Sequence, residues 1–304
     1  MFFWIIITII AHLLNAIVFI IDKHLVSKTV MKPVAYAFYS CIFLFVYLAL
    51  IPFGFVVSEF KYTIIGIALG VLFTFILLVF YKAIQAGEST RIVPAVGGLT
   101  PVFTFILAYL FIGERLEITQ VIALVLFIFG GFLLSSKISK EHLKIIKGAK
   151  MAVLAAFLFA IYYTLMKFLF SHISFLSGFI IIQIGAFLGA VILALPARNR
   201  KAIFAPASAA GAMKKEALYL FVPDKILGAV AGFLIPYAIS MEAASVTVIN
   251  SLQAVQYVFL LVFAIILSKK FPSFFKEQIG EKVIKRKIAA IILIGIGLLI
   301  ISWG

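Results

Sequence analysis

The chain has 304 residues, of which 65% are hydrophobic and 12% are charged, and its formal net charge is +15. A soluble domain of this length would need far more charge on its surface. The basic residues lie in gaps between apolar segments, where positive charge orients a membrane protein, so we expect membrane lipid and no nucleic acid as a partner. The single cysteine, Cys41, lies inside an apolar segment, which argues against a disulfide framework, and we expect no metal and no cofactor.

Apolar segments of about 20 residues, the length that crosses a hydrocarbon core of about 30 Å, recur along the whole chain. None shows the alternating pattern of barrel strands. We therefore predict an all-α membrane protein with about ten transmembrane helices, at residues 2–21, 33–51, 62–81, 92–112, 118–135, 149–170, 174–195, 226–240, 246–267 and 288–303. The long connection at residues 197–224 is predicted to be a surface segment with a short interfacial helix.

The first half of the sequence recurs weakly in the second half. A shift of 156 positions places Tyr81 on Tyr237, Ser89 on Ser245, and Val102-Phe103 on Val258-Phe259. This predicts two five-helix repeats, at residues 1–136 and 149–304, joined by a basic linker at 137–148. Because five is odd, the second repeat must cross the membrane in the opposite sense. That is the inverted-repeat plan of secondary transporters, whose substrate site lies near the midplane.

The distribution of lysine and arginine predicts the orientation. Nearly all of these residues fall in the odd-numbered gaps, and the even-numbered gaps hold only Lys61, Arg115 and Lys167. Because positive loops stay on the cytoplasmic side, we expect cytoplasmic odd-numbered loops and both termini outside, in the inner or plasma membrane of the cell.

The segment at residues 83–116, AIQAGESTRIVPAVGGLTPVFTFILAYLFIGERL, contains Pro101-Val102-Phe103 and closes on Gly113-Glu114-Arg115-Leu116. It resembles the signature of the EamA-type branch of the drug/metabolite transporter superfamily. The resemblance implies a duplicated five-plus-five helix fold and transport of amino acids, other metabolites or sugar-linked compounds. The second half departs from it, with Ser268-Lys269-Lys270 in place of the Gly-Glu closure. Ten-helix relatives are usually drawn with cytoplasmic termini, opposite to the orientation that the charges predict.

Polar side chains inside a membrane are costly unless they are paired or face water, so each is a candidate for function. The main group lies in the ninth span at spacings of three and four, which predicts a shared helix face, at Asn250, Gln253, Gln256 and Tyr257. The repeat aligns this face with the fourth span at Pro94, Gly97, Thr100 and Pro101. These residues either line a cavity, which we favour, or form interhelical hydrogen bonds only.

Other candidates are spread over several spans. His12 and Asn15 lie three apart near the middle of the first span, and His12 is either a buried neutral histidine, which we favour, or a proton carrier. Further residues expected to face the substrate are Tyr39, Tyr81, Tyr162, Tyr163, Gln183 and Tyr237. The candidates for gating or coupling are Lys82, Glu88, Arg91 and Glu242. For Glu88 and Arg91 we favour capping of a helix start over gating.

The spans hold no pair of acids, nucleophile motif or metal-ligand cluster, so we predict a protein that is not an enzyme and has no catalytic residues. The predicted function is secondary transport, in the export direction, of a small polar organic metabolite by alternating access. Amides and tyrosines favour a neutral or zwitterionic solute such as an amino acid. The alternatives are a flippase or subunit that handles a lipid-linked head group, and a non-transporting scaffold. The nearly pure apolar fifth and tenth spans are expected at the periphery, against lipid or a second copy in a homodimer.

Overall fold

The computed structural model describes residues 3–26, 32–86, 89–135, 148–204, 215–270 and 281–303, and these ranges contain helices and no strand. The helices are α1 (Phe3–Val26), α2 (Pro33–Phe43), η1 (Leu44–Phe53), α3 (Phe60–Ala86), α4 (Ser89–Ile112), α5 (Ile118–Ser135), α6 (Ala149–Phe170), α7 (Phe175–Ala194), α8 (Ala197–Ile203), α9 (Lys215–Ser240), α10 (Val246–Ser251), α11 (Gln253–Lys270) and α12 (Glu281–Trp303). The predicted all-α class is confirmed. Within the described ranges, seven helices are long and apolar enough to cross a membrane.

The second predicted span, 33–51, corresponds to the membrane-length segment Pro33–Phe53, which is an α-helix followed by a 3₁₀ helix. Pro33 begins α2, which suits proline because a first-turn residue needs no helical N–H donor. After Phe43 the chain tightens into the 3₁₀ helix η1, which contains Pro52 and ends at Gly54 with φ 122°. Proline lacks the backbone donor of a final turn, and glycine tolerates a positive φ, so both residues favour an ending at this point.

Two helices begin earlier than the apolar pattern predicts. α9 starts at Lys215 rather than at 226, and α12 starts at Glu281 rather than at 288. Both extensions contain charged residues, which are good helix formers but do not count as apolar. Part of the predicted surface segment, 197–224, therefore belongs to α9, and Asp224 is fully buried there. The short helix expected in this segment is α8.

The ninth predicted span, 246–267, is interrupted. Its polypeptide forms α10 up to Ser251, turns at Leu252, and continues as α11 from Gln253. The Val255 N–H bonds to the Leu252 carbonyl at 2.9 Å, an i to i−3 bond that tightens the turn. By contrast, α4 runs without interruption through Pro94, Gly97, Gly98 and Pro101.

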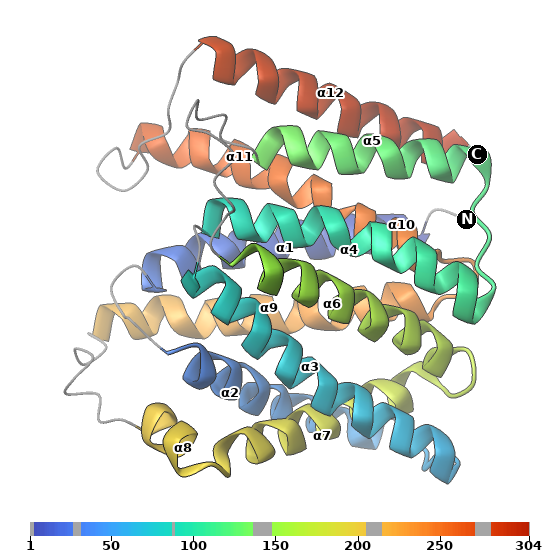
Figure 1. The fold of residues 1–304 in the computed structure, drawn as a ribbon, viewed down its shortest axis with the longest axis vertical. Coiled ribbons are helices and arrows are strands. Elements are labelled where there is room, and N and C mark those ends of the chain that lie inside the picture. Colours follow the sequence, from blue (N-terminus) through green and yellow to red (C-terminus); the bar gives the residue numbers. More distant parts are fainter. Residues whose placement is uncertain are drawn as a thin grey trace.

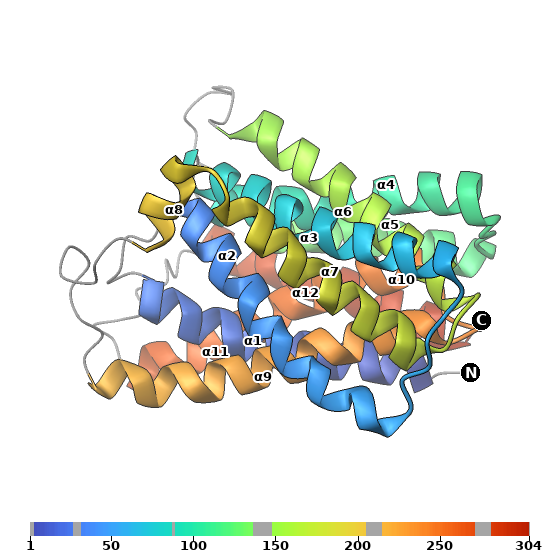
Figure 2. The ribbon, with the colours of Figure 1, turned by 90° about the horizontal axis from the view of Figure 1, so that it is seen from below.

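The helices form one elongated bundle with both chain termini at the same end (Figures 1 and 2). The main contacts pair α3 with α7 and α6, α5 with α12, α1 with α9 and α11, and α4 with α6 and α10. α5 and α12 lie together at one edge of the bundle (Figure 1). Each of these two helices exposes a stripe of apolar side chains, including Phe129 and Phe132 on α5 and Ile292 and Leu299 on α12.

Two glycines of these peripheral helices, Gly130 and Gly297, serve contacts inside the chain. A Cβ at Gly130 would meet the Ile294 side chain at 2.6 Å, and one at Gly297 would meet the Phe127 ring at 2.8 Å. Both glycines therefore let α5 and α12 approach each other. Association of a second copy through these helices stays a prediction.

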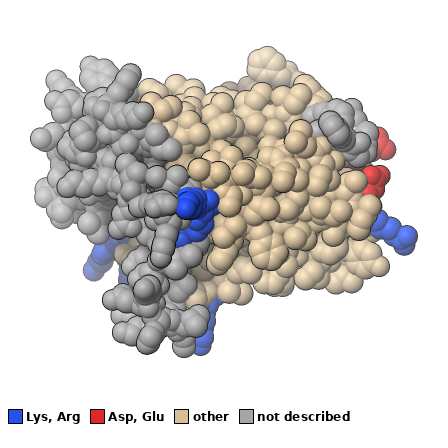
Figure 3. All heavy atoms as spheres, turned by 90° about the horizontal axis from the view of Figure 1, so that it is seen from above, with Lys and Arg blue, Asp and Glu red and all other residues tan. Residues whose placement is uncertain are grey.

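On the face seen in Figure 3, the described charged residues lie toward the two ends of the bundle, and the middle carries none. At the end opposite the termini, the described charged side chains that are exposed are all basic: Lys32, Lys82, Lys150, Arg198, Arg200, Lys201 and Lys285. At the end with the termini, the exposed charges are mixed: Glu59, Lys61, Arg115, Glu117 and Glu242. Large apolar side chains are exposed between the two ends, which is the pattern of a surface covered by lipid hydrocarbon.

Candidate functional site

A seam of neutral polar side chains runs along the contact between α4 and the interrupted crossing formed by α10 and α11. Ser245 caps the N-terminus of α10, and its hydroxyl accepts a hydrogen bond from the Val248 N–H at 3.0 Å. This cap fixes the start of α10, all six residues of which are buried. The turn at Leu252 then sets the direction of α11 and of its polar side chains.

At the α10 end of the seam, Asn250 is bonded to α4. Its Nδ2 donates to the Thr104 Oγ1 at 3.1 Å, and Thr104 in turn donates to the Thr100 carbonyl at 2.8 Å. Thr100 donates to the Val96 carbonyl, also at 2.8 Å. Asn250, Thr104 and Thr100 are all buried, so this chain of hydrogen bonds is shielded from solvent and lipid.

At the α11 end, Gly97 makes room for two polar side chains. A Cβ at this position would collide with the Tyr257 hydroxyl and would lie 3.1 Å from the Gln253 Oε1. The Tyr257 hydroxyl also lies 3.5 Å from the Val93 carbonyl of α4. Because Pro101 has no N–H, the Gly97 carbonyl lacks its helical donor, and the α4 backbone is more polar here than in an ordinary helix. The seam thus brings a tyrosine and an amide against the buried α4 backbone at Gly97.

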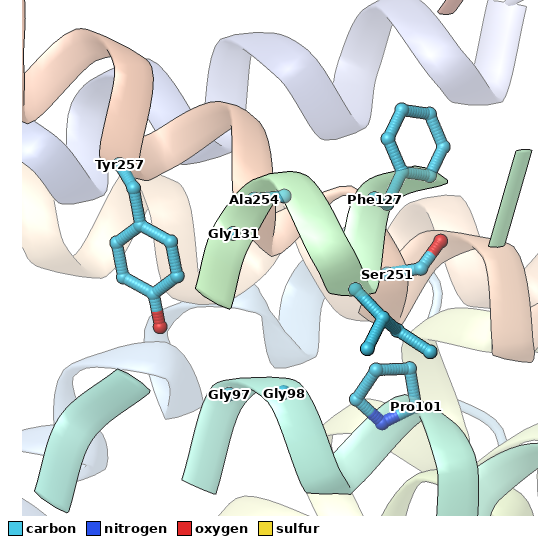
Figure 4. Close-up of a pocket in the computed structure, with 9 residues that line it drawn as sticks. Gly97, Gly98, Pro101, Phe127, Gly131, Ser251, Ala254 and Tyr257 are labelled. Atoms are coloured by element: carbon cyan, nitrogen blue, oxygen red, sulfur yellow. The ribbon is translucent and has the colours of Figure 1, made fainter. Parts of the chain in front are cut away.

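A small cleft lies beside this contact, between α4, α5, α10 and α11. Its walls are formed by Gly97, Gly98, Pro101, Phe127, Ile128, Gly131, Ser251, Ala254 and Tyr257. In Figure 4 the Tyr257 ring extends from α11 toward the part of α4 that carries Gly97 and Gly98. The cleft holds about 230 Å³ of empty space, its open side included. This is less than the volume of about 300–1,000 Å³ usual for small-molecule sites, so the seam is nearly closed.

Gln256 points to a different helix from the other three residues of the ninth span. Its Oε1 lies 3.3 Å from the Nδ1 of His12 on α1, a contact that needs a proton on Nδ1. At about 100° per residue, Gln256 is turned by roughly 100° from Tyr257. The predicted single face is therefore two faces, because Asn250, Gln253 and Tyr257 face α4 while Gln256 faces α1. His12 is buried, and Asn15 lies half-buried on the same helix.

Several predicted substrate residues lie elsewhere in the bundle. Tyr39 donates to the Ile203 carbonyl of α8 at 3.2 Å, and Tyr81 packs against Tyr36 with ring centroids 4.6 Å apart. The remaining ones belong to aromatic or helix packing: Tyr162 and Tyr163 on α6, Tyr237 beside Phe175, and Gln183 buried on α7. The structure does not bring these residues to the seam. The side chain of Pro94 lies outside the described residues.

Two of the four gating candidates lie within the described residues, at opposite ends of the bundle. Lys82 is exposed near the end of α3, and Glu242 is exposed in the turn between α9 and α10. Glu88 and the Arg91 side chain lie outside the described residues. Residues of the gating type that the sequence analysis did not select are Glu114, which follows α4, and Lys167 on α6. Glu114 accepts a hydrogen bond from the Thr247 hydroxyl at 3.1 Å, and Lys167 donates to the Met241 carbonyl at 2.6 Å.

Comparison with known proteins finds a family match in the N-terminal part of the chain. The model of the EamA-like transporter family matches residues 2–136. Seventeen chains of solved structures are similar in fold. One of them, titled only "Crystal structure of protein", is 16% identical, and the alignment covers 98% of this chain and 96% of that one with a TM-score of 0.69. At this identity the likeness shows the fold alone, and no curated protein matches the chain.

The matched residues contain α1 to α5, including the Gly97 side of the seam and the Gly113-Glu114-Arg115-Leu116 closure. Seven helices within the described residues can cross a membrane. Residues 2–136 of this multi-pass membrane protein therefore match the EamA-like transporter family, a family of the drug/metabolite transporter superfamily.

Proposed function

We propose that the protein is a secondary transporter that exports a small neutral or zwitterionic organic solute, such as an amino acid, by alternating access. The observation that carries the proposal is the seam between α4 and α10–α11, where Asn250, Gln253 and Tyr257 meet the α4 backbone and Thr104. None of the side chains in these contacts carries a fixed charge. A strongly anionic solute would need an arginine or lysine there, whereas amides and hydroxyls suit a solute without net charge.

The proposal includes two inverted five-helix repeats, and several of the helix contacts support it, whereas the α3–α7 contact has no α9–α2 counterpart of similar extent. The proposed repeats pair α1 with α6, α2 with α7, α3 with α9, α4 with α10–α11, and α5 with α12. When each helix is replaced by its counterpart in the other repeat, the α1–α9 contact becomes the α6–α3 contact, and the α4–α6 contact becomes the α11–α1 contact. All four contacts are present in the structure. The α5–α12 and α4–α10 contacts convert into themselves. A pseudo-twofold axis in the membrane plane would have this effect, and it would pass through the seam.

The closed seam supports the proposal of alternating access. The cleft is too small for a typical solute, and the hydrogen bonds of Asn250 and Tyr257 hold α4 against α10 and α11. Binding therefore requires α4 and α10–α11 to separate. That separation leaves amides and carbonyls of the seam without partners, and each unpaired buried polar group costs about 1–3 kcal/mol. A bound solute offsets this cost when its own polar groups form hydrogen bonds with them.

The proposal can be tested by transport in proteoliposomes. A thermal-stabilisation screen with amino acids, nucleosides and sugars would select the solute, and counterflow of the radiolabelled solute would then be measured. Gln253→Ala and Tyr257→Phe should each lower the initial rate by about tenfold or more, because each removes a polar contact that the solute must replace. Full rates in both variants, at equal amounts of folded protein, would remove the seam as the site.

Matched controls come from residues away from the seam. Tyr109 lies on α4 with 55% of its surface exposed, and Gln85 is exposed near the end of α3. Tyr109→Phe and Gln85→Ala make the same chemical changes as the test variants. Both controls should transport at the rate of the unaltered protein, which separates loss of the site from a general effect of the substitution.

The proposed orientation places the basic end of the bundle in the cytoplasm, and it predicts a labelling pattern. Lys150 is exposed at that end and Glu117 at the end with the termini. In a Cys41→Ala background, an impermeant maleimide should label Glu117→Cys in intact cells but Lys150→Cys only after permeabilisation, because positive loops stay in the cytoplasm. The reverse pattern would invert the orientation and leave the site proposal unaffected.

A further inference from the structure

The end of the bundle that holds the termini contains a cluster of charged and hydroxyl groups that the proposed transport site does not use. Glu114 follows the left-handed Gly113, with φ 67°, which ends α4 and turns the chain toward the bundle. Its Oε2 accepts a hydrogen bond from Thr247 in the first turn of α10. Its Oε1 is enclosed and has no hydrogen-bond partner among the described residues. Glu114 therefore links the end of α4 to the start of α10.

Lys167 lies close to this carboxyl but is bonded to another group. Its Nζ donates to the Met241 carbonyl in the turn between α9 and α10, and no direct ion pair joins it to Glu114 in the described structure. Glu242, next to Met241, is the other acid whose charge acts on Lys167. In the same turn as Glu114, Arg115 and Glu117 are exposed. The described residues of α10 add hydroxyl groups but no titratable side chain.

This arrangement suits an uncharged carboxyl. Burial raises the pKa of Glu114 above its ordinary value of 4.5, and the neighbouring hydroxyls of Ser245 and Thr247 and the charge of Lys167 oppose the rise only in part. A carboxylate would leave one charged oxygen enclosed without a donor, which is costly. Because the folded state binds the Glu114 proton more tightly than the unfolded state, protonation stabilises the fold. This stabilisation is complete below about pH 4.5 and is lost as the pH rises through the raised pKa.

We propose that Glu114 is a proton-binding site whose protonation state decides whether Lys167 holds the α9–α10 turn. With the proton bound, the uncharged Glu114 carboxyl keeps its hydrogen bond from Thr247. Lys167 then keeps its hydrogen bond to the Met241 carbonyl, which fixes the α9–α10 turn. When the proton leaves to solvent, the carboxylate attracts Lys167 away from Met241, and the turn that leads into α10 is released. A role of this Glu114-controlled contact between Lys167 and Met241 in coupling protons to transport rests on the proposed transport function. The movement of Lys167 itself requires no solute.

Release of the α9–α10 turn can be measured as a distance in the full chain without any solute. His172 in the α6–α7 turn and Ala243 in the α9–α10 turn are both exposed, and they flank the cluster. We would attach spin labels to His172→Cys and Ala243→Cys in a Cys41→Ala background, in phosphatidylcholine nanodiscs. This pair also removes His172 as a competing titratable group. We expect a single short distance at about pH 5 and an added longer population at about pH 8.

Variants assign the effect to its residue. Glu114→Gln should keep the short distance at both pH values, and Lys167→Met should show the longer population at both, because Met241 then has no donor. Glu117→Gln, an exposed acid of the same turn, and Glu242→Gln should keep the pH response. A pH-independent distance in the unaltered background would overturn the proposal, and so would a response that survives in Glu114→Gln or disappears in Glu242→Gln. Counterflow remains a separate test, so either proposal can fail alone.

Discussion

Gly185→Val should prevent the protein from accumulating in folded form. Gly185 lies on α7 where this helix crosses α3, and a Cβ there would collide with the Ile67 carbonyl oxygen and lie 2.8 Å from the Ile67 Cα. Gly70 on α3 approaches the α7 backbone equally closely, and a Cβ at Gly189 would lie 2.9 Å from the Thr74 Cβ. The two backbones are therefore in direct contact over about one helical turn on each side of Gly185.

The collision in Gly185→Val involves backbone, which cannot move aside as the tip of a side chain can. Overpacking typically costs about 1–3 kcal/mol and occasionally more, and this position belongs at the upper end because the whole α3–α7 crossing must separate. The yield of monodisperse protein and its thermal midpoint measure the effect. Gly295→Val on α12 is the control, since a Cβ at Gly295 meets nothing within 4 Å. Equal yields and midpoints for the two variants would contradict the described crossing.

Gly97→Ala should lower transport by about tenfold or more while the protein stays folded. The added methyl group takes the place of the Tyr257 hydroxyl and lies 3.1 Å from the Gln253 Oε1 and 3.2 Å from its Cδ. Both neighbours are ends of flexible side chains, so they can move aside at a modest cost to the fold. The cost falls on the site instead, because the two polar groups that we propose to bind the solute are displaced from α4. A tenfold change corresponds to about 1.4 kcal/mol.

The measurement for Gly97→Ala is the initial counterflow rate per amount of folded protein in the vesicles. Gly228→Ala on α9 is the matched control, since a Cβ at Gly228 meets only the Val18 methyl groups at 3.9 Å, an ordinary van der Waals contact. We expect the control to transport normally. A Gly97→Ala protein with an unchanged rate would show that the approach of Tyr257 to α4 is irrelevant to transport.

Much of the fold could be predicted because the membrane imposes one strong rule, that a crossing helix needs about 20 apolar residues. The helical class and the approximate positions of the spans follow from that rule. The rule fails where a helix continues into polar sequence, as at Lys215 and Glu281, because hydrogen bonds along the backbone do not depend on hydropathy. The inverted arrangement of two repeats stays a prediction that the helix pairing supports.

The interruption of the ninth span had no signal in the sequence. The residues around Leu252 include no proline or glycine, whereas α4 contains two of each and is continuous. Proline and glycine indicate where a helix can break, but neighbouring helices decide where it does. Tertiary contact also explains why Glu114 was missed: in the sequence it resembles an exposed charge after a helix, and only the packing of α10 encloses it.

In the transport cycle that we propose, the turn at Leu252 has a consequence for the order of events. It divides the polar residues of the seam between two helices. Asn250 lies on α10, nearer the termini, and Tyr257 lies on α11, nearer the basic end of the bundle. Each helix has its own bond to α4, so either bond can break while the other persists. A solute arriving from the basic side meets the Tyr257 contact first, and a solute leaving on the opposite side passes the Asn250 contact last. Sequential opening of two barriers, without an open pore between them, is what distinguishes a carrier from a channel.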